Sequence, residues 1–145
     1  MSELTHLDKD GQAQMVDVSR KKQQRRKAKA TGFIRLSETT IRCITDQAIQ
    51  KGDVLTIAKI AGIQAAKRTS ELIPLCHPIP LEHIDVNAEI EEGGVSVTSE
   101  VTSTGRTGVE MESLTAVSVA LLTIYDMGKA IDKNMRIEDL RLLEK

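Results

Sequence analysis

Aromatic side chains are almost absent from this chain. Among its 145 residues there is no tryptophan, and Phe33 and Tyr125 are its single phenylalanine and tyrosine. Recognition of single-stranded nucleic acid depends largely on bases stacking on aromatic rings. The net charge of −1 also differs from that of a globally basic nucleic-acid binder. The composition therefore argues against a nucleic-acid-binding module and predicts a core of aliphatic residues.

Cysteine and long apolar runs are also scarce. Cys43 and Cys76 do not form a CxxC pair, and they are typical of reduced thiols rather than of a disulfide. The polar N-terminus has no apolar signal segment, and no stretch approaches the ~20 apolar residues that span a bilayer. We expect a cytoplasmic protein without a membrane partner. Walker, GxGxxG, GxSxG and metal-ligand motifs are missing too, so no cofactor or metal is indicated.

The basic run Arg20–Lys29 is the most uneven feature of the charge distribution. Such a run is often a solvated stretch, but it also suits an arm that folds over a polyanion such as a triphosphate or nucleic acid. We interpret residues 1–30 as a flexible basic N-terminal arm and residues 31–145 as a single catalytic α+β domain.

Periodicity predicts the elements of that domain. Alternating apolar residues predict strands at 31–36, 81–90, 95–101 and 135–143, of which the middle two form a hairpin. Helical spacing predicts helices from the Ser37 cap to about Gln50, from Val54 to Arg68, and from Val109 to Ile131. This order indicates an α+β fold, with helices on one face of a mainly antiparallel sheet.

The segment Leu72–Pro80, LIPLCHPIP, holds all three prolines of the chain. Proline fixes the backbone, so this segment should be a rigid loop that presents Cys76 and His77. A lone histidine is more often a hydrogen-bonded structural residue than a catalyst, and both readings stay open.

The long helix carries two carboxylates that cannot meet. Glu112 and Asp126 are fourteen residues apart, which separates them by about 21 Å along an ideal helix. Asp126 and Lys129 are neighbours on one face and could exchange a proton, provided that the lysine pKa is lowered if it acts as a base. If both carboxylates are functional, they serve different ends of a long ligand or different sites in an oligomer. The alternative is that Glu110 and Lys129 only stabilise the two ends of the helix dipole. That role would need no ligand.

Five strings together resemble the cyclic pyranopterin monophosphate synthase family of molybdenum cofactor biosynthesis. They are KGDV (51–54), IAGIQAAKRT (60–69), LIPLCHP (72–78), TGRTGVEMESLTA (104–116) and TIYDMGKA (123–130). The resemblance implies a ferredoxin-like fold and a lyase. Its substrate would be 3′,8-cyclo-7,8-dihydroguanosine 5′-triphosphate, a cyclic purine-derived nucleotide, and its products cyclic pyranopterin monophosphate and diphosphate. Whether Mg²⁺ accompanies the triphosphate stays open.

The resemblance also assigns roles by motif. Asp126, Lys51 and Lys129 would be catalytic. The substrate-binding residues would be Leu75, Cys76, His77, Met111, Glu112, Lys67, Lys21 and Arg26. The family is associated with a homohexamer, a trimer of dimers with active sites at the dimer interface, and antiparallel pairing of two long helices would bring Glu112 near the other subunit's Asp126. A non-catalytic assembly domain is the remaining alternative, but it would leave the rigid LCHP loop unexplained.

Overall fold

The computed structural model describes residues 4–47 and 53–145. Four strands form one antiparallel sheet in the order β2-β3-β1-β4. The strands are β1 (Gln24–Arg35), β2 (Leu81–Glu91), β3 (Gly94–Gly105) and β4 (Arg136–Glu144), and the helices are α1 (Glu38–Thr45), α2 (Val54–Lys67), α3 (Thr69–Leu72) and α4 (Glu110–Gly128). The order along the chain and the sheet order are those of a ferredoxin-like α+β fold, as expected.

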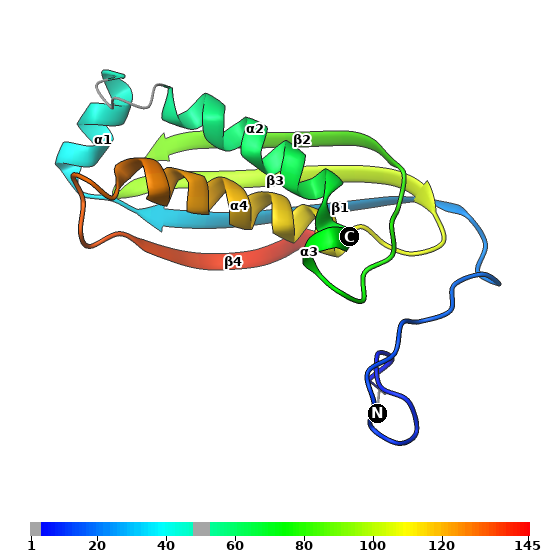
Figure 1. Ribbon diagram of the computed structural model, residues 1–145. Helices are drawn as coiled ribbons and strands as arrows, with labels where there is room; N and C mark the ends of the chain where they lie inside the picture. The colour runs from blue at the N-terminus through cyan, green and yellow to red at the C-terminus, as the bar shows by residue number, and fades with distance from the viewer. Residues whose placement is uncertain (1–3, 48–52) are drawn as a thin grey trace.

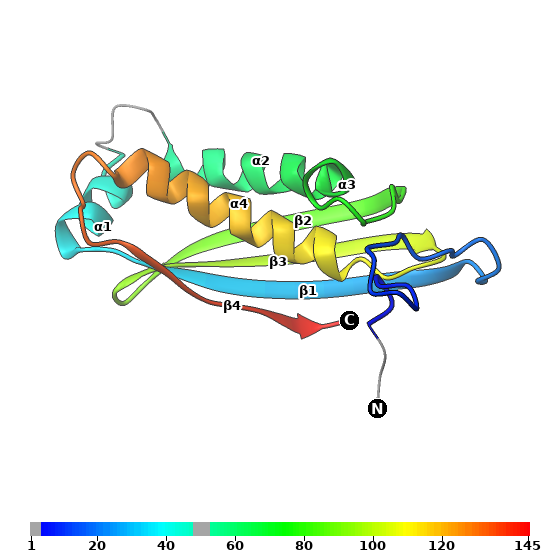
Figure 2. The ribbon, with the colours of Figure 1, turned by 60° about the horizontal axis from the view of Figure 1, so that its bottom comes forward.

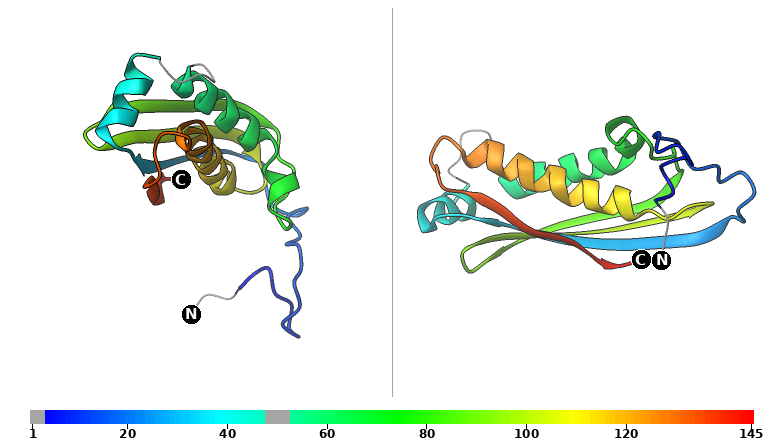
Figure 3. Two further views of the ribbon diagram at one scale, coloured as in Figure 1. Left: turned by 60° about the vertical axis from the view of Figure 1, so that its left-hand side comes forward. Right: turned by 90° about the horizontal axis from the view of Figure 1, so that it is seen from below.

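The molecule has two layers. Helices α2 and α4 lie side by side on one face of the sheet, and the other face is not covered by any described helix (Figures 2 and 3). Small residues let the two helices approach closely: a Cβ on Gly62 of α2 would stand 2.9 Å from the carbonyl oxygen of Ala116 in α4. The core between the layers is aliphatic, as the composition predicts, and includes Ile34, Val97 and Leu121.

The first strand begins seven residues earlier than the sequence pattern predicts, at Gln24 rather than Thr31. Its inward positions hold small residues such as Ala28, Ala30 and Gly32, which are buried. The lysines between them lie on the open face, where Lys27 and Lys29 pair with Glu100 and Glu144. The C-terminal part of the basic run is therefore strand, because acidic cross-strand neighbours balance its charge.

The helices differ from expectation at their ends. Helix α1 has the predicted Ser37 cap but ends at Thr45, short of the predicted end near Gln50, which itself lies outside the described residues. Helix α3 adds one turn before the proline loop. Helix α4 is three residues shorter at its C-terminal end than predicted. Across the described ranges, no helix has the length and apolar character that a membrane span requires.

One side of α4 stays uncovered in the single chain. Val117, Leu121 and Ile124 recur at spacings of four and three residues, which predicts one buried helix face, and all three are buried. On the other side, Leu122 and Tyr125 are exposed by 57% and 38%, although the uncharged middle of the helix predicts burial on most faces. This outer side therefore remains available for contact with another molecule.

Candidate functional site

The candidate residues gather at the two ends of α4. The proline loop, α3, the N-terminal arm and the start of α4 lie at one end of the molecule, whereas α1 and the last turn of α4 lie at the other (Figure 1). Fourteen residues of helix separate Glu112 from Asp126, which is about 21 Å along the axis. Because α4 is continuous between them, Glu112 and Asp126 lie apart in the structure, as the helix geometry predicts. The end near Glu112 is called the loop end, and the end near Asp126 the lysine end.

At the loop end, Glu112 is buried although it carries an ionisable group. Glu112 lies in the first turn of α4 and is 4% exposed. Burial raises the pKa of Glu112 above 4.5, a hydrogen bond from its own backbone N–H opposes this, and the charge of Glu110 reinforces it. Burial also raises the pKa of the Cys76 thiol, and the charge of Glu112 adds to that shift. The proline loop therefore lies close enough to the start of α4 for the charge of Glu112 to act on Cys76.

His77 connects the proline loop to the arm. Its Nε2 lies 2.6 Å from the backbone carbonyl oxygen of Val16. A carbonyl can only accept a hydrogen bond, so this contact places a proton on Nε2. The charge of His77 also contributes to lowering the pKa of Asp17, after the larger effect of hydrogen bonds from Ser19. In this arrangement the arm lies against the loop, and His77 makes a hydrogen bond that a structural histidine would also make.

A cavity of about 170 Å³ opens beside this contact. Val18 and Gln23 from the arm, His77 from the loop, and Arg106 from the turn before α4 are among its lining residues. Neither Gln23 nor Arg106 is among the residues that the sequence patterns single out. Arg106 lies between Gly105 and Gly108 in the GRTG turn, just before the predicted start of a helix. A cation at that position was the one sequence feature that could have indicated a role in binding.

The other predicted binding residues also occupy the loop end or its surroundings. Lys67 is the last residue of α2 and is exposed. Arg26, in β1, donates from Nε to the carbonyl oxygen of Gly105 at 3.4 Å. Lys21 is exposed and closes a backbone turn with Val18. These three cations therefore come from three separate elements: the arm, the start of β1 and the end of α2.

Leu75 and Met111 accompany the ionisable groups of the loop end. Leu75 is half-buried in the proline loop, and Met111 is 38% exposed in the first turn of α4, one position before Glu112. Apolar side chains beside a buried carboxylate suit contact with the uncharged part of a ligand.

At the lysine end, Asp126 and Lys129 form an ion pair with Nζ and Oδ1 2.8 Å apart. The hydrogen bond that Lys129 donates to Asp126, and then the negative charge of Asp126, raise the pKa of Lys129 above its ordinary value. Lys129 is therefore protonated in this arrangement. A protonated lysine suits the role of an acid, or of a cation that binds an anion, rather than that of a base. Lys51, the third predicted catalytic residue, lies outside the described residues.

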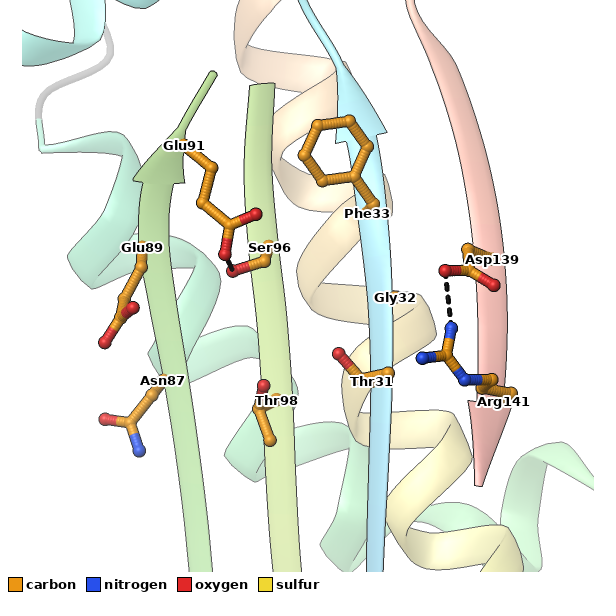
Figure 4. A pocket seen from close by; sticks show the side chains of 10 residues that line it. All are labelled: Thr31, Gly32, Phe33, Asn87, Glu89, Glu91, Ser96, Thr98, Asp139 and Arg141. Atoms are coloured by element: carbon orange, nitrogen blue, oxygen red, sulfur yellow. Dashed lines mark hydrogen bonds and ion pairs between the residues drawn. The ribbon is translucent and has the colours of Figure 1, made fainter. Parts of the chain in front are cut away.

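A cavity of about 440 Å³ on the open face of the sheet contains none of the candidate residues. Figure 4 shows its polar lining from all four strands, with Ser96 donating to Glu91 at 2.8 Å and Arg141 paired with Asp139. It is a shallow polar surface on the side of the sheet opposite α4. In the ranges 4–47 and 53–145, no group of three His, Cys, Asp or Glu side chains is placed to hold a metal ion.

The fold and the two polar clusters define a ferredoxin-like α+β protein whose ionisable groups stand at both ends of one packed helix. Comparison with known proteins is more specific. The family model described as the MoaC family matches residues 15–145, and the chain belongs to that family.

Two curated relatives match over the whole chain. A cyclic pyranopterin monophosphate synthase from Heliobacterium modesticaldum is 56% identical over 147 residues, covering 100% of this chain and 92% of the relative. A protein of the same name from Novosphingobium aromaticivorans is 54% identical over 145 residues, with the same coverage.

Proposed function

We propose that the protein is a cyclic pyranopterin monophosphate synthase. It is a lyase that converts 3′,8-cyclo-7,8-dihydroguanosine 5′-triphosphate into cyclic pyranopterin monophosphate and diphosphate, in molybdenum cofactor biosynthesis. The observation that carries this proposal is the identity above 50%, over the whole chain, with two relatives of that name. The positions of the described candidate residues at the two ends of α4 are a second observation in its support.

The chemistry requires two kinds of site. The triphosphate needs cations, and rearrangement of the ring system needs groups that move protons. Lys21, Arg26 and Lys67 provide cations around the loop end. Asp126 and Lys129 provide a proton-transfer pair at the lysine end. We assign substrate binding to Leu75, Cys76, His77, Met111 and Glu112, together with these three cations.

The ion pair at the lysine end suggests how the catalytic roles divide. Because the pKa of Lys129 is raised, we assign Lys129 as the group that donates a proton or stabilises negative charge. Asp126 orients it. The role of base then falls to Lys51, assigned through its KGDV motif.

The separation of the two ends leads us to propose a site shared between subunits. Two α4 helices that pair antiparallel about a two-fold axis near Val119 would place Glu112 of one copy opposite Asp126 of the other. The uncovered side of α4, with Leu122 and Tyr125, is a suitable surface for this contact because it is apolar and lies between the two clusters.

The remaining features of the proposal concern the assembly and its surroundings. We propose a homohexamer built as a trimer of such dimers, without a resident metal or cofactor and without a nucleic-acid or membrane partner. A cytoplasmic location accords with the free thiols of Cys43 and Cys76, because reduced cysteines are usual in that compartment. Any Mg²⁺ would arrive with the triphosphate.

Turnover of the cyclic triphosphate tests the proposal directly. Purified protein is incubated with that substrate, diphosphate is quantified, and the pterin product is oxidised and detected by its fluorescence. We expect both products in equal amounts, and at least a hundredfold less of both from Lys129→Ala, about the size of effect that removal of a proton-transfer group produces. Absence of both products with the intact protein would refute the proposed function.

A further inference from the structure

The segment after α4 carries a buried carboxylate that none of the roles above uses. Asp132 is 7% exposed and lies four residues after the end of α4. Its Oδ2 accepts hydrogen bonds from the backbone N–H of Ser37 and from Oγ1 of Thr40, both at 2.9 Å. Its Oδ1 accepts one from the backbone N–H of Asn134 at 3.2 Å. One side chain thus joins two segments that lie more than ninety residues apart in the sequence.

The partners of Asp132 form the N-terminal cap of α1. The Oγ of Ser37 accepts from the backbone N–H of Thr40 at 3.2 Å and also lies 2.9 Å from the Thr40 hydroxyl oxygen. Thr40 is fully buried, and its methyl group faces Gly128 in the last turn of α4. A Cβ added to Gly128 would stand 3.6 Å from that methyl carbon. The start of α1 is therefore seated directly on the end of α4.

The connection continues to the catalytic pair. The backbone N–H of Asp132 donates to the carbonyl oxygen of Gly128 at 3.0 Å, which closes the turn that contains Lys129. Asp126 lies two residues before Gly128. A shift of α1 or of this turn would therefore change where the Asp126–Lys129 pair points relative to the rest of the lysine end.

The carboxylate is well suited to hold this junction. Burial acts to raise the pKa of Asp132, but hydrogen bonds from Ser37, Asn134 and Thr40 outweigh it and hold the pKa below its ordinary value. The group is therefore charged at neutral pH, and its hydrogen bonds are charge-assisted, which makes them stronger than bonds between neutral groups.

We propose that Asp132 is a positioning residue, which clamps the start of α1 to the end of α4 and thereby holds the Asp126–Lys129 pair in its reactive orientation. It acts through its hydrogen bonds with Ser37, Thr40 and Asn134 and does not touch the substrate. Its role in turnover rests on the proposed function, whereas the clamp itself does not.

The test compares three full-length variants with the unchanged protein. Asp132→Asn keeps the shape of the side chain but replaces one acceptor oxygen with a donor, so at least one of its three hydrogen bonds is lost. Thr40→Val removes one donor from the other side of the junction. Val97→Ala, in the core between sheet and helices, is the control for loss of stability without loss of the clamp. All are assayed well below their melting temperatures.

Two readouts decide the outcome. Hydrogen exchange should become at least tenfold faster in residues 38–45 and 126–134 of Asp132→Asn and Thr40→Val, but not in α2 or β3. With turnover measured in parallel, kcat should fall about ten- to hundredfold in Asp132→Asn while KM changes less than about threefold, since misplacement of a catalytic group has effects of this size. Val97→Ala should keep its kcat.

Each contrary result has its own meaning. Unchanged exchange at residues 38–45 would overturn the clamp whatever the activity. Faster exchange with an unchanged kcat, or an equal loss of kcat in Val97→Ala, would overturn the positioning role. If the unchanged protein does not turn over the cyclic triphosphate, the proposed function fails, and the exchange rates alone still decide whether Asp132 holds α1 to α4.

Discussion

A site shared between subunits makes a quantitative prediction for mixed oligomers. Glu112→Ala and Asp126→Ala should each be inactive, because each removes one end of every site. In a dimer that contains one chain of each kind, one site combines the two substitutions, but the other combines the intact Glu112 of one chain with the intact Asp126 of the other. Antiparallel pairing of α4 therefore restores one site in each mixed dimer.

The expected recovery follows from counting sites. Random exchange of equal amounts gives about half mixed dimers, and each has one of its two sites intact, so about a quarter of the wild-type activity should return. If each chain instead carried a complete site of its own, no activity would return. The two arrangements therefore differ by more than the error of an ordinary turnover assay.

A second mixture provides the matched control. The double variant Glu112→Ala, Asp126→Ala is mixed with an equal amount of wild-type protein. In a shared site, both sites of each mixed dimer lack one group, so about a quarter of all sites stay active; with separate sites, about half would. Subunit exchange is verified by native mass spectrometry with a tagged chain. No recovery in the first mixture despite complete exchange would refute the shared site.

Three further predictions concern stability and assembly. Because folding raises the pKa of Glu112, the folded wild-type protein loses stability as the pH rises from 4.5 toward that raised pKa. Glu112→Gln has no such loss, so its free energy of unfolding relative to wild type should increase between pH 4.5 and pH 8. A difference between the two proteins that is the same at both pH values would contradict this. Gly62→Ala should cost about 1–3 kcal/mol in urea unfolding, because its Cβ would stand 2.9 Å from the Ala116 carbonyl oxygen, whereas Gln64→Ala on the exposed side should change little. Leu122→Lys should dissociate the oligomer in sedimentation experiments and lower turnover with it, and an unchanged sedimentation coefficient would exclude the α4 contact.

The sequence predicts the fold well because most elements have a clear period. Alternation in the hairpin and the spacing of Val117, Leu121 and Ile124 identify β2, β3 and α4 without knowledge of their partners. The predicted start of β1 was wrong because the residues that face the core there are alanine and glycine. Between lysines, these small residues give only a weak apolar alternation. Gly32 has to be small since a Cβ there would stand 2.7 Å from Leu121, and this contact is visible in three dimensions alone.

The candidate site is predictable to a different degree at its two ends. The ion pair of Asp126 and Lys129 follows from their spacing, because residues three apart on a helix are neighbours. The burial of Glu112 and its effect on Cys76 do not follow from spacing, since they depend on where the proline loop packs. The role of Asp132 is not predictable from the sequence for the same reason: its partners Ser37 and Thr40 lie more than ninety residues away, and its own sequence surroundings are those of an ordinary polar turn.

Helix α4 accounts for the arrangement of both ends. A single rigid helix keeps Glu112 and Asp126 about 21 Å apart, a distance greater than one reacting centre can use. Its buried side is held against the sheet by Val117 and Leu121, so the two ends cannot approach each other without loss of the core. In the proposed dimer, each α4 would supply one half of each of two sites, and the apolar residues left uncovered between the two clusters would form the contact with the second copy. The clamp at Asp132 has its place in this scheme, because a site assembled from two chains requires each half to be held in position before the halves meet.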